Sequence, residues 1–437
     1  MTILRNAHIL TMNEKMTEYT DGFLAFDEKG IIGLGDEKEF PEEWACLPSE
    51  DLHHDLVLPS LINTHTHMGM VSFRSLGDDC PDRLHRFLMP LEDRAMNREL
   101  AVCSSKMAMA EMMLSGISSA VDMYYFEADV ARAAAQLGFR LWAGETLLDK
   151  PHCDADSFEA SLERTEETIA ACGESPLTIP IVAPHAPYSL SLEHLKDAFS
   201  FAKERHLLWT THLSEMAFEV ETLRKDQGKT PVGWLSANGL LDDSLLAAHL
   251  LLLTEEDIDL LSGSGVSAAH CPGSNAKAAK GVAPALKMID RDINVTLATD
   301  GPASGNALEL FTTLRLCAIL QKNLSHDRSV APARNIVPLA TRNAGIALRR
   351  KIGVLKEGWE SDILVLSMSR PNMIPSYDPY SVLVYSAGVQ NVQDLYIAGV
   401  RKVRDGMLTD IDLDELETEF SSVSEPFHRE AMKLSRN

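Results

Sequence analysis

The chain has 437 residues, enough for one large domain of ~250 to 300 residues and a smaller one. Its composition, 45% hydrophobic and 24% charged, is that of an ordinary soluble protein. With 40 Lys and Arg against 64 Asp and Glu, the formal net charge is -24, which repels phosphate backbones and anionic membranes. We therefore expect no nucleic-acid partner and no membrane partner.

The amino terminus and the cysteines indicate the cellular compartment in which the protein is expected. Polar residues interrupt the first segment before an apolar run reaches signal-peptide length, and no segment approaches ~18 apolar residues. The 7 cysteines are an odd number without Cys-x-x-Cys spacing, which is typical of reduced thiols. These features predict a cytoplasmic protein.

Short strands separated by turns are predicted at both ends of the chain. They are 3–12, 22–26 and 30–34 at the start, and 361–366, 392–398 and 400–403 near the end. The simplest arrangement pairs the two ends into one small β-sandwich domain, made of 1–57 and 359–411. Residues 412–437 form a C-terminal segment with two predicted helices, 414–420 and 426–433, the second starting at its proline.

The large middle domain, 58–358, alternates short β-rich runs with amphipathic stretches, the pattern of parallel strands joined by helices. The strand candidates are 56–67, 118–125, 140–147, 177–185, 206–212, 245–252, 266–270 and 293–300. Apolar residues recur at three- and four-residue steps in the predicted helices 99–115, 128–137, 192–204 and 255–261. We therefore predict an α/β fold, a distorted (β/α)8 TIM barrel that carries the β-sandwich.

Titratable side chains gather where these strands end. His65 and His67 are two residues apart, so within a strand they project from the same face and can share one ion. The other strand-end groups are His185, His212, His249, His270 and Asp300. Because the chemistry of such barrels gathers at the carboxyl ends of the strands, the joint pattern predicts a metal-dependent active site.

The motifs that contain these residues resemble the amidohydrolase superfamily. They are Pro-Ser-Leu-Ile-Asn-Thr-His-Thr-His at 59–67, His-Leu-Ser-Glu at 212–215, His249, His-Cys-Pro-Gly-Ser-Asn at 270–275 and Thr-Asp-Gly at 299–301. More narrowly, the chain looks like the branch of S-adenosylhomocysteine and methylthioadenosine deaminases, with triazine hydrolases and guanine deaminase as relatives. The match runs through the whole chain, and the ordered combination is far more specific than His-x-His alone.

Three neutral imidazoles and one carboxylate suit a single divalent ion. We assign it to His65, His67, His212 and Asp300. Zinc is the expected metal, one per subunit, with iron(II) and manganese(II) as alternatives. A remaining coordination position would hold water whose pKa falls toward neutrality. The fourth strand ends at 183–185 without a lysine that could bridge a second metal, which favours a one-metal site.

The catalytic assignments follow from residue type and position. Glu215, three residues after His212, is the predicted proton shuttle to a ring nitrogen and contacts the substrate. Asp300 would accept the water proton, and His249 would hydrogen-bond the hydroxide or the developing oxyanion. Collapse of the tetrahedral adduct would then expel ammonia. Cys271 has no base and orienting group of its own, so we do not expect a nucleophile there.

The resemblance implies further substrate contacts. Glu92 corresponds to a glutamate that binds ribose hydroxyls, and His185 to a histidine that reaches the nucleoside. Arg140 loosely matches a family arginine at the third strand, whereas a second family arginine, downstream of Glu145, has no clear counterpart. Relatives use the strand that ends at His270 to shape the pocket, and we give this histidine a structural role.

The predicted function is that of a zinc-dependent aminohydrolase acting on C–N bonds in cyclic amidines. It converts the amino group of a purine-like heterocycle, an adenosine thioether or a related adenosine, into a carbonyl. Two alternatives stay open: a guanine- or pterin-type deaminase or triazine-type hydrolase, and a metal-binding scaffold without turnover. Intact Glu215 and His249 oppose the scaffold. The resemblance also implies a homo-oligomer, a dimer or a tetramer, with a small heterocyclic substrate as its partner.

Overall fold

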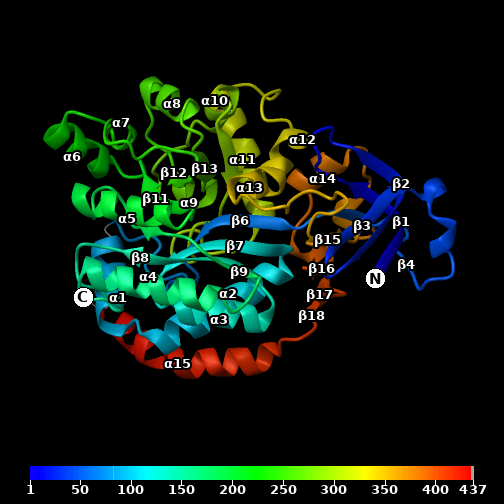
Figure 1. The fold of residues 1–437 in the computed structure, drawn as a ribbon, viewed down its shortest axis with the longest axis horizontal. Helices are drawn as coiled ribbons and strands as arrows, with labels where there is room; N and C mark the ends of the chain where they lie inside the picture. Colours follow the sequence, from blue (N-terminus) through cyan, green and yellow to red (C-terminus); the bar gives the residue numbers. More distant parts are fainter. Residues whose placement is uncertain (82, 435–437) are drawn as a thin grey trace. The chain divides into compact units, whose positions relative to one another are not determined.

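The computed structural model describes residues 1–81 and 83–434. Backbone proximity divides the chain into two compact units. The first comprises Met1–Asn63, Glu111–Ser119 and Glu309–Asp410, and the second comprises Thr64–Ala110, Ala120–Leu308 and Ile411–Asn437. Strands and helices occur in both units, which confirms the predicted α/β class (Figure 1). The domain boundaries after residues 57, 358 and 411 remain predictions from the sequence.

The first unit is built on a nine-stranded sheet that combines both ends of the chain. Its strands are β1 Thr2–Leu10, β2 Glu18–Asp27, β3 Gly30–Asp36, β4 Glu50–Asp51, β5 Leu56–Pro59, β15 Ile363–Leu366, β16 Val392–Ile397, β17 Val400–Arg404 and β18 Met407–Leu408. They are ordered β18-β17-β16-β15-β5-β1-β2-β3, with β4 on β1. Val57 of β5 lies opposite Ile9 of β1 and Val365 of β15, so the expected pairing of the two chain ends is confirmed.

Helices of the first unit follow the second unit's last strand in sequence. They are α11 Leu310–Ser325, α12 Ala333–Ile336, α13 Arg342–Ala347 and α14 Pro379–Tyr385. Asp378 caps α14 by accepting a hydrogen bond from the backbone N–H of Tyr380, and Pro379 occupies the first turn, where its missing N–H costs nothing.

Parallel strands form the second unit. They are β6 Leu61–Thr66, β7 Ile117–Tyr124, β8 Arg140–Leu147, β9 Thr178–Pro180, β10 Ala183–Pro184, β11 Trp209–Leu213, β12 Leu245–His249, β13 Ser267–His270 and β14 Asn294–Leu297, of which β6 and β7 begin in segments of the first unit. One sheet has the order β10-β8-β7-β6, with β9 on β8, and the other has the order β11-β12-β13-β14. All pairings within the second sheet are parallel.

Two predicted strands are each divided in the structure. The segment predicted at 56–67 separates into β5 and β6 at Ser60, and the one predicted at 177–185 separates into β9 and β10. Each break lies beside a proline, Pro59 or Pro180, which has no N–H to donate to a sheet ladder. The histidines that end these segments still follow a strand, His67 after β6 and His185 after β10.

Several helices of the second unit begin at a capping side chain. The helices of this unit are α1 Met89–Ala95, α2 Arg98–Leu114, α3 Glu127–Leu137, α4 Phe158–Cys172, α5 Leu192–Glu204, α6 Ala217–Gln227, α7 Pro231–Ala237, α8 Glu255–Ser262, α9 Pro272–Lys277, α10 Ala285–Asp290 and α15 Leu413–Leu434. The hydroxyls of Ser157, Ser191 and Thr254 cap α4, α5 and α8 by accepting backbone N–H bonds. Gly138 ends α3 in the left-handed conformation, φ 70°, that favours glycine.

The last helix differs from the prediction, because α15 is continuous where two helices were expected. Pro426 lies inside it, although an interior proline typically costs about 3 kcal/mol. Phe427 and Ala431 continue the apolar face beyond the proline, and the Phe427 ring packs on Phe73 with centroids 4.7 Å apart. This burial holds the second half of the helix in line with the first.

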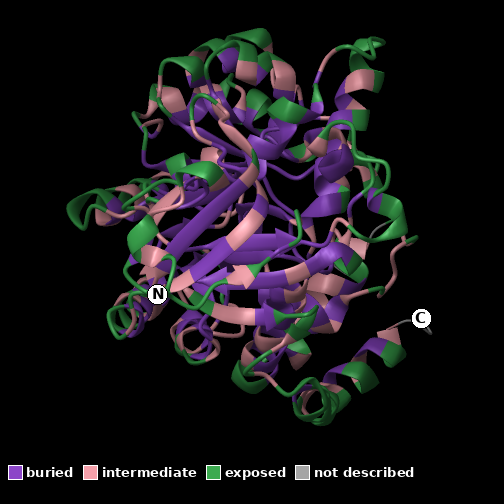
Figure 2. Cartoon of the chain, turned by 90° about the vertical axis from the view of Figure 1, so that its right-hand side faces the viewer, coloured by how far each residue is buried: buried purple, intermediate pink, exposed green. Residues whose placement is uncertain are grey.

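Within each unit, the strands are mostly buried and the helices are partly exposed. Figure 2 shows the strands largely in purple, as buried segments, and the outward sides of helices in green. Among the described residues, no helix is both long enough and apolar enough to cross a membrane.

Candidate active site

A histidine pair lies at the carboxyl end of β6. His65 is fully buried, and its ring centroid lies 4.8 Å from that of His67, which follows the last residue of the strand. Gly301 approaches His67 closely: a Cβ at this glycine would lie 2.8 Å from the His67 Cβ. The glycine after Asp300 therefore lets the loop after β14 pack against the pair.

All four predicted metal ligands converge there. His212, in β11, brings its Nε2 to 3.2 Å from the His67 Nε2, and an Asp300 carboxylate oxygen lies 3.4 Å from the same His67 nitrogen. Ligand atoms lie within 4.8 Å of one another in two overlapping groups, His65, His67 and Asp300, and His65, His212 and His249. The His249 ring, which is predicted to contact the hydroxide, thus lies among the predicted ligands.

The donor set suits a divalent cation. Neither ring nitrogen of the buried His65 has a hydrogen-bond partner among the described residues, and a buried imidazole without partners is costly. Burial, followed by the neighbouring histidines, lowers the pKa of His65 and of His212 well below the usual value, so both rings are neutral at pH 7 and can coordinate an ion. These residues fit a metal ion.

Hydrogen bonds orient the ligand rings. The Nδ1 of His67 lies 2.6 Å from the carbonyl oxygen of Met123, and the Nδ1 of His212 lies 2.7 Å from the carbonyl oxygen of His185. A ring that donates from Nδ1 to a carbonyl presents its Nε2 to the metal, so these two contacts fix the tautomer and the ring plane.

Glu215 follows β11 and is held through its backbone and through one carboxylate oxygen. The carboxylate of Glu219 accepts the backbone N–H groups of Ser214 and Glu215, each at 2.9 Å. An oxygen of the Glu215 side chain forms an ion pair with Lys280 and lies 3.7 Å from the His249 Nε2. Burial acts to raise the pKa of Glu215, but His249 and Lys280 outweigh it and hold that pKa well below the usual value.

His249 ends β12 in an uncommon backbone conformation. Its φ is 74°, and Asp300 likewise has a φ of 62°, in the left-handed region that non-glycine residues rarely occupy. Such backbone costs of order 1–3 kcal/mol per residue and is concentrated at functional sites. The side-chain oxygen of Asn275, in α9, lies 3.1 Å from the His249 Nδ1 and orients the ring.

Of the predicted substrate contacts, Glu92 and His185 lie near the ligands. Glu92 is in α1 and accepts a hydrogen bond of 2.9 Å from the Tyr124 hydroxyl, and burial raises its pKa to about 7. The His185 ring lies 4.8 Å from that of His212, and its Nδ1 is 3.0 Å from the Ser189 hydroxyl. Burial, with His67 next, lowers the pKa of His185 to about 4.

Arg140 is placed differently from the other predicted residues. It is the first residue of β8, whereas the carboxyl end of that strand pairs with Pro184, next to His185. Seven residue steps at about 3.3 Å each put Arg140 roughly 23 Å along the strand from that end. The structure therefore does not bring Arg140 to the ligands, and its role in substrate binding stays a prediction.

Three further residues discussed from the sequence are buried. Neither ring nitrogen of His270 has a hydrogen-bond partner among the described residues, and burial lowers its pKa to about 4. Cys271 is buried, which raises the pKa of its thiol well above the usual value and opposes a nucleophilic role. Glu145, upstream of the place where a family arginine has no counterpart, accepts the backbone N–H of Glu127 at 2.9 Å.

Several residues of the site were not predicted. Asp122, at the end of β7, accepts the Thr66 hydroxyl at 2.7 Å and the Met68 backbone N–H at 2.8 Å, and so braces the segment that carries His67. The strand-end rule could have found it, because it lies within the predicted strand 118–125. Lys280 gave no signal, since a single lysine among small residues in a loop is usually a solvated charge.

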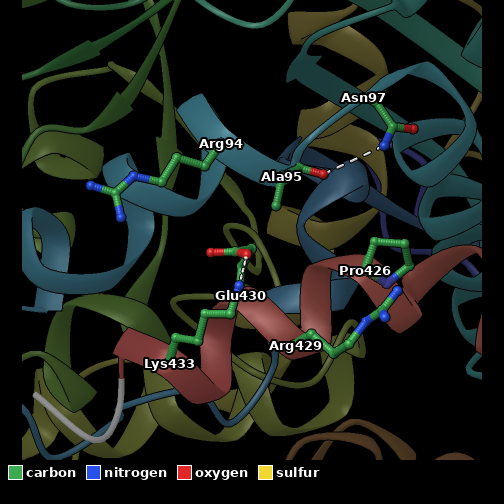
Figure 3. A pocket seen from close by; sticks show the side chains of 7 residues that line it. All are labelled: Arg94, Ala95, Asn97, Pro426, Arg429, Glu430 and Lys433. Atoms are coloured by element: carbon green, nitrogen blue, oxygen red, sulfur yellow. Dashed lines mark hydrogen bonds and ion pairs between the residues drawn. The ribbon is translucent and has the colours of Figure 1, made fainter.

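A separate hollow lies between α1 and α15, with a volume of about 350 Å³. Figure 3 shows Arg94 and Asn97 on one side and Arg429 and Lys433 on the other, with Glu430 reaching Lys433. None of its lining residues belongs to the metal-binding groups.

Residues 56–402 match the amidohydrolase family, and the chain belongs to this family. The match spans most of the chain and includes every candidate ligand. It confirms the resemblance inferred from the histidine and aspartate motifs.

Two curated relatives show which members of the family this chain is similar to. The chain is 37% identical over 378 residues to a 5-methylthioadenosine/S-adenosylhomocysteine deaminase of Pyrococcus horikoshii, covering 85% of this chain and 89% of the relative. It is 34% identical over 436 residues to 5-methylthioadenosine/S-adenosylhomocysteine deaminase 1 of Syntrophus aciditrophicus, covering 99% and 98%. A solved adenosine deaminase from Xanthomonas campestris with bound zinc has a TM-score of 0.94, 28% identity and 98% coverage of both chains.

Proposed function

We propose that the protein is a metal-dependent hydrolase that deaminates an adenosine-like substrate, 5′-methylthioadenosine or S-adenosylhomocysteine being the leading candidates. The convergence of His65, His67, His212 and Asp300 beside Glu215 carries the proposal. Deaminases related to this chain over most of its length give the substrate class. The reaction hydrolyses a C–N bond of a cyclic amidine and releases ammonia.

Zinc is the proposed metal, one ion per subunit. The neutral imidazoles of His65 and His212 and the carboxylate of Asp300 are ligands that zinc accepts, and the adenosine deaminase with the same fold was solved with zinc. A zinc ion in such a site supplies a Lewis acid and a nucleophilic water at neutral pH.

The remaining steps belong to side chains of this protein. Asp300 accepts one proton of the attacking water and passes it to the departing amino group, and Glu215 takes up the other and delivers it to the ring nitrogen next to the carbon under attack. His249, 3.7 Å from the Glu215 carboxylate, stabilises the oxyanion that develops on the former water oxygen. A C–O bond forms and the C–N bond to the amino group breaks, so the two water protons end on the ring nitrogen and on ammonia.

Glu92 and His185 are proposed to bind the nucleoside. Glu92 is partly exposed and held by Tyr124, so it can accept hydrogen bonds from ribose hydroxyls. His185 stands next to His212, where a nucleoside at the metal would pass. A guanine- or pterin-type deaminase or a triazine-type hydrolase would use the same metal site and Glu215, but would not need Glu92.

The finer architecture is also a proposal: the two parallel sheets close into a barrel. Thr64 of β6 hydrogen-bonds Thr296 of β14 at 2.7 Å, and Val182, beside β10, pairs with Trp209 of β11. These contacts join both pairs of sheet edges, as barrel closure requires. In the first unit, β1, β2, β3, β5, β15 and β16 share one apolar core, which supports a β-sandwich.

We further propose a cytoplasmic homo-oligomer, a dimer or a tetramer. All seven cysteines are free thiols, which supports a reducing compartment.

Ammonia release tests the proposed function. Protein of assayed metal content is given S-adenosylhomocysteine, methylthioadenosine, adenosine, guanine, pterins and aminotriazines in turn. Release from the thioether nucleosides supports the proposal in full. Release from a free base or a pterin alone keeps the chemistry and replaces the substrate, whereas silence across the panel rejects deamination of these heterocycles.

A further inference from the structure

A lysine ammonium lies inside the site. Lys280 is in the loop between α9 and α10, and its side chain is about three-quarters buried, with 24% of its surface exposed. The ammonium forms an ion pair with Oε1 of Glu215. Asp300, a candidate metal ligand, also acts on the Lys280 charge. A cation is thus placed directly at the proposed proton shuttle.

Glu215 has separate supports for its backbone and for its carboxylate. Glu219 accepts the backbone N–H groups at 214, 215 and 216, so the backbone is fixed without Lys280. On the side chain, both Lys280 and His249 lie at Oε1. Among the described residues this leaves Oε2 as the oxygen that can face a substrate.

The Lys280 side chain is not needed to hold its own loop. The backbone N–H of Lys280 donates to the Asn275 carbonyl at 3.0 Å, and that of Ala278 donates to the Ser274 carbonyl at 3.0 Å. The neighbouring Lys277 ties the end of α9 to Asp78 and Asn306. The loop therefore has its own hydrogen bonds, and the Lys280 ammonium is available for another role.

We propose that Lys280 is a positioning residue for the reaction, which anchors Oε1 of Glu215 so that Oε2 is turned toward the ring nitrogen of the substrate. The inference rests on the proposed deamination. A buried carboxylate without a partner can rotate away from its working position toward water. The ion pair at Oε1 prevents this rotation, and Oε2 stays free to take up one proton and pass it to the ring.

The proton balance leaves the pair unchanged. Oε2 gains a proton during the attack of water and gives it to the ring nitrogen as the C–O bond forms. When the C–N bond breaks and ammonia leaves, Glu215 is again a carboxylate and Lys280 is still an ammonium. Lys280 therefore transfers no proton and touches no substrate atom; it acts through Glu215.

Steady-state kinetics of the metal-loaded full chain with methylthioadenosine test this role. Lys280→Met should lower kcat about 100-fold, within the range typical of lost acid–base catalysis, and leave KM within about threefold. Lys280→Arg, which keeps the charge, should recover at least a tenth of the wild-type kcat. Lys280→Ala should regain activity with added methylammonium or ethylammonium, saturably, because a small cation can occupy the vacated place.

Lys287→Met is the matched control. Lys287 pairs with Glu255 in the same half of the molecule, but its side chain is 62% exposed and this pair lies at the surface. Its removal should leave kcat and KM within twofold of wild type. Metal content and thermal unfolding are measured for every variant, so that loss of the ion or of the fold is seen directly.

The outcomes separate the two proposals. A wild-type protein that releases ammonia from no member of the panel rejects the proposed deamination. An active wild type whose Lys280→Met variant keeps its kcat rejects the role of Lys280 alone. The positioning role of Lys280 is also wrong if Lys280→Met and Lys280→Arg lose the metal or the fold equally and added amines do not rescue Lys280→Ala. The lysine would then have a structural role.

Discussion

Glu92 is only partly exposed and accepts a hydrogen bond from Tyr124, and its ionisation falls in the physiological range. Burial raises its pKa to about 7, while the Tyr124 hydroxyl donates to the carboxylate. Below pH 7 the group is a carboxylic acid, and above pH 7 it is a carboxylate that can accept both ribose hydroxyls. The affinity for a ribosyl substrate should therefore rise with pH between 6 and 8.

Glu92→Gln tests this expectation at the residue scale. Hydrogen bonds to a charged acceptor contribute about 1.5–3 kcal/mol, so KM for methylthioadenosine at pH 8 should rise about 10- to 100-fold. The wild-type KM should fall from pH 6 to pH 8, and that of the variant should stay flat. Glu99→Gln, at an exposed position in α2, is the control. An unchanged KM in Glu92→Gln would remove Glu92 from the ribose site.

At the scale of elements, the segment between β6 and α1 contains the short helical turns η3 Met68–Phe73 and η4 Leu84–Leu88. Met70, Phe73 and Phe87 lie in one apolar cluster with Phe427 of α15, so these side chains pack in the core. Asp78 fastens the segment to Lys277 and to Asn306, each at 2.9 Å. Since the candidate metal ligands are mostly buried, we expect this segment to move when a substrate enters.

Lys277→Met should loosen the segment. The ion pair with Asp78 is partly exposed, and such pairs contribute about 0.5–1 kcal/mol, so the open population should rise about 2- to 5-fold. Trypsin cleavage within 74–86 measures that population, because slow cleavage reports the opening equilibrium. Lys203→Met, which removes an exposed pair with Asp242, should leave the cleavage rate unchanged. Equal rates in wild type and Lys277→Met would show that this pair does not hold the segment.

For the whole molecule, metal binding and folding are coupled. The ligand set forms only in the fold, so a metal that binds it stabilises the protein by about 2.7 kcal/mol at a concentration 100 times its Kd. Dialysis against a chelator should abolish ammonia release and lower Tm by several degrees, and added zinc should restore both. Asp300→Asn should show a smaller zinc-dependent increase in Tm. If neither the Tm nor the rate of ammonia release changed with chelator or with zinc, the metal assignment would be wrong.

The metal-free protein should also be sensitive to acid. His65 and His212 have a pKa well below 6.5 in the fold, whereas an unfolded chain binds protons at these rings near the usual value. Above pH 6.5 these rings are neutral in both states and do not oppose folding. Below pH 6.5 the unfolded chain binds more protons at them than the folded chain, so the free energy of unfolding falls.

The sequence by itself determined the class of fold, the family and the set of residues that the structure brings together as a candidate metal site. Strand-end positions of His65, His67, His212 and Asp300 follow from hydrophobic runs that stop at polar residues, and this pattern is local. The continuity of α15 through Pro426 was not predictable in the same way. It depends on Phe427 packing against Phe73, and these residues are far apart in the chain.

Only the tertiary structure decided which other side chains serve the site. Lys280 and Asp122 lie 65 and more than 90 residues from Glu215 along the chain, and no periodicity links them. Likewise, a loose motif match suggested Arg140 as a substrate contact, and the direction of β8 places it at the opposite end of its strand. Charge pairing and strand direction act through space, so their consequences follow from folded coordinates and not from the order of residues.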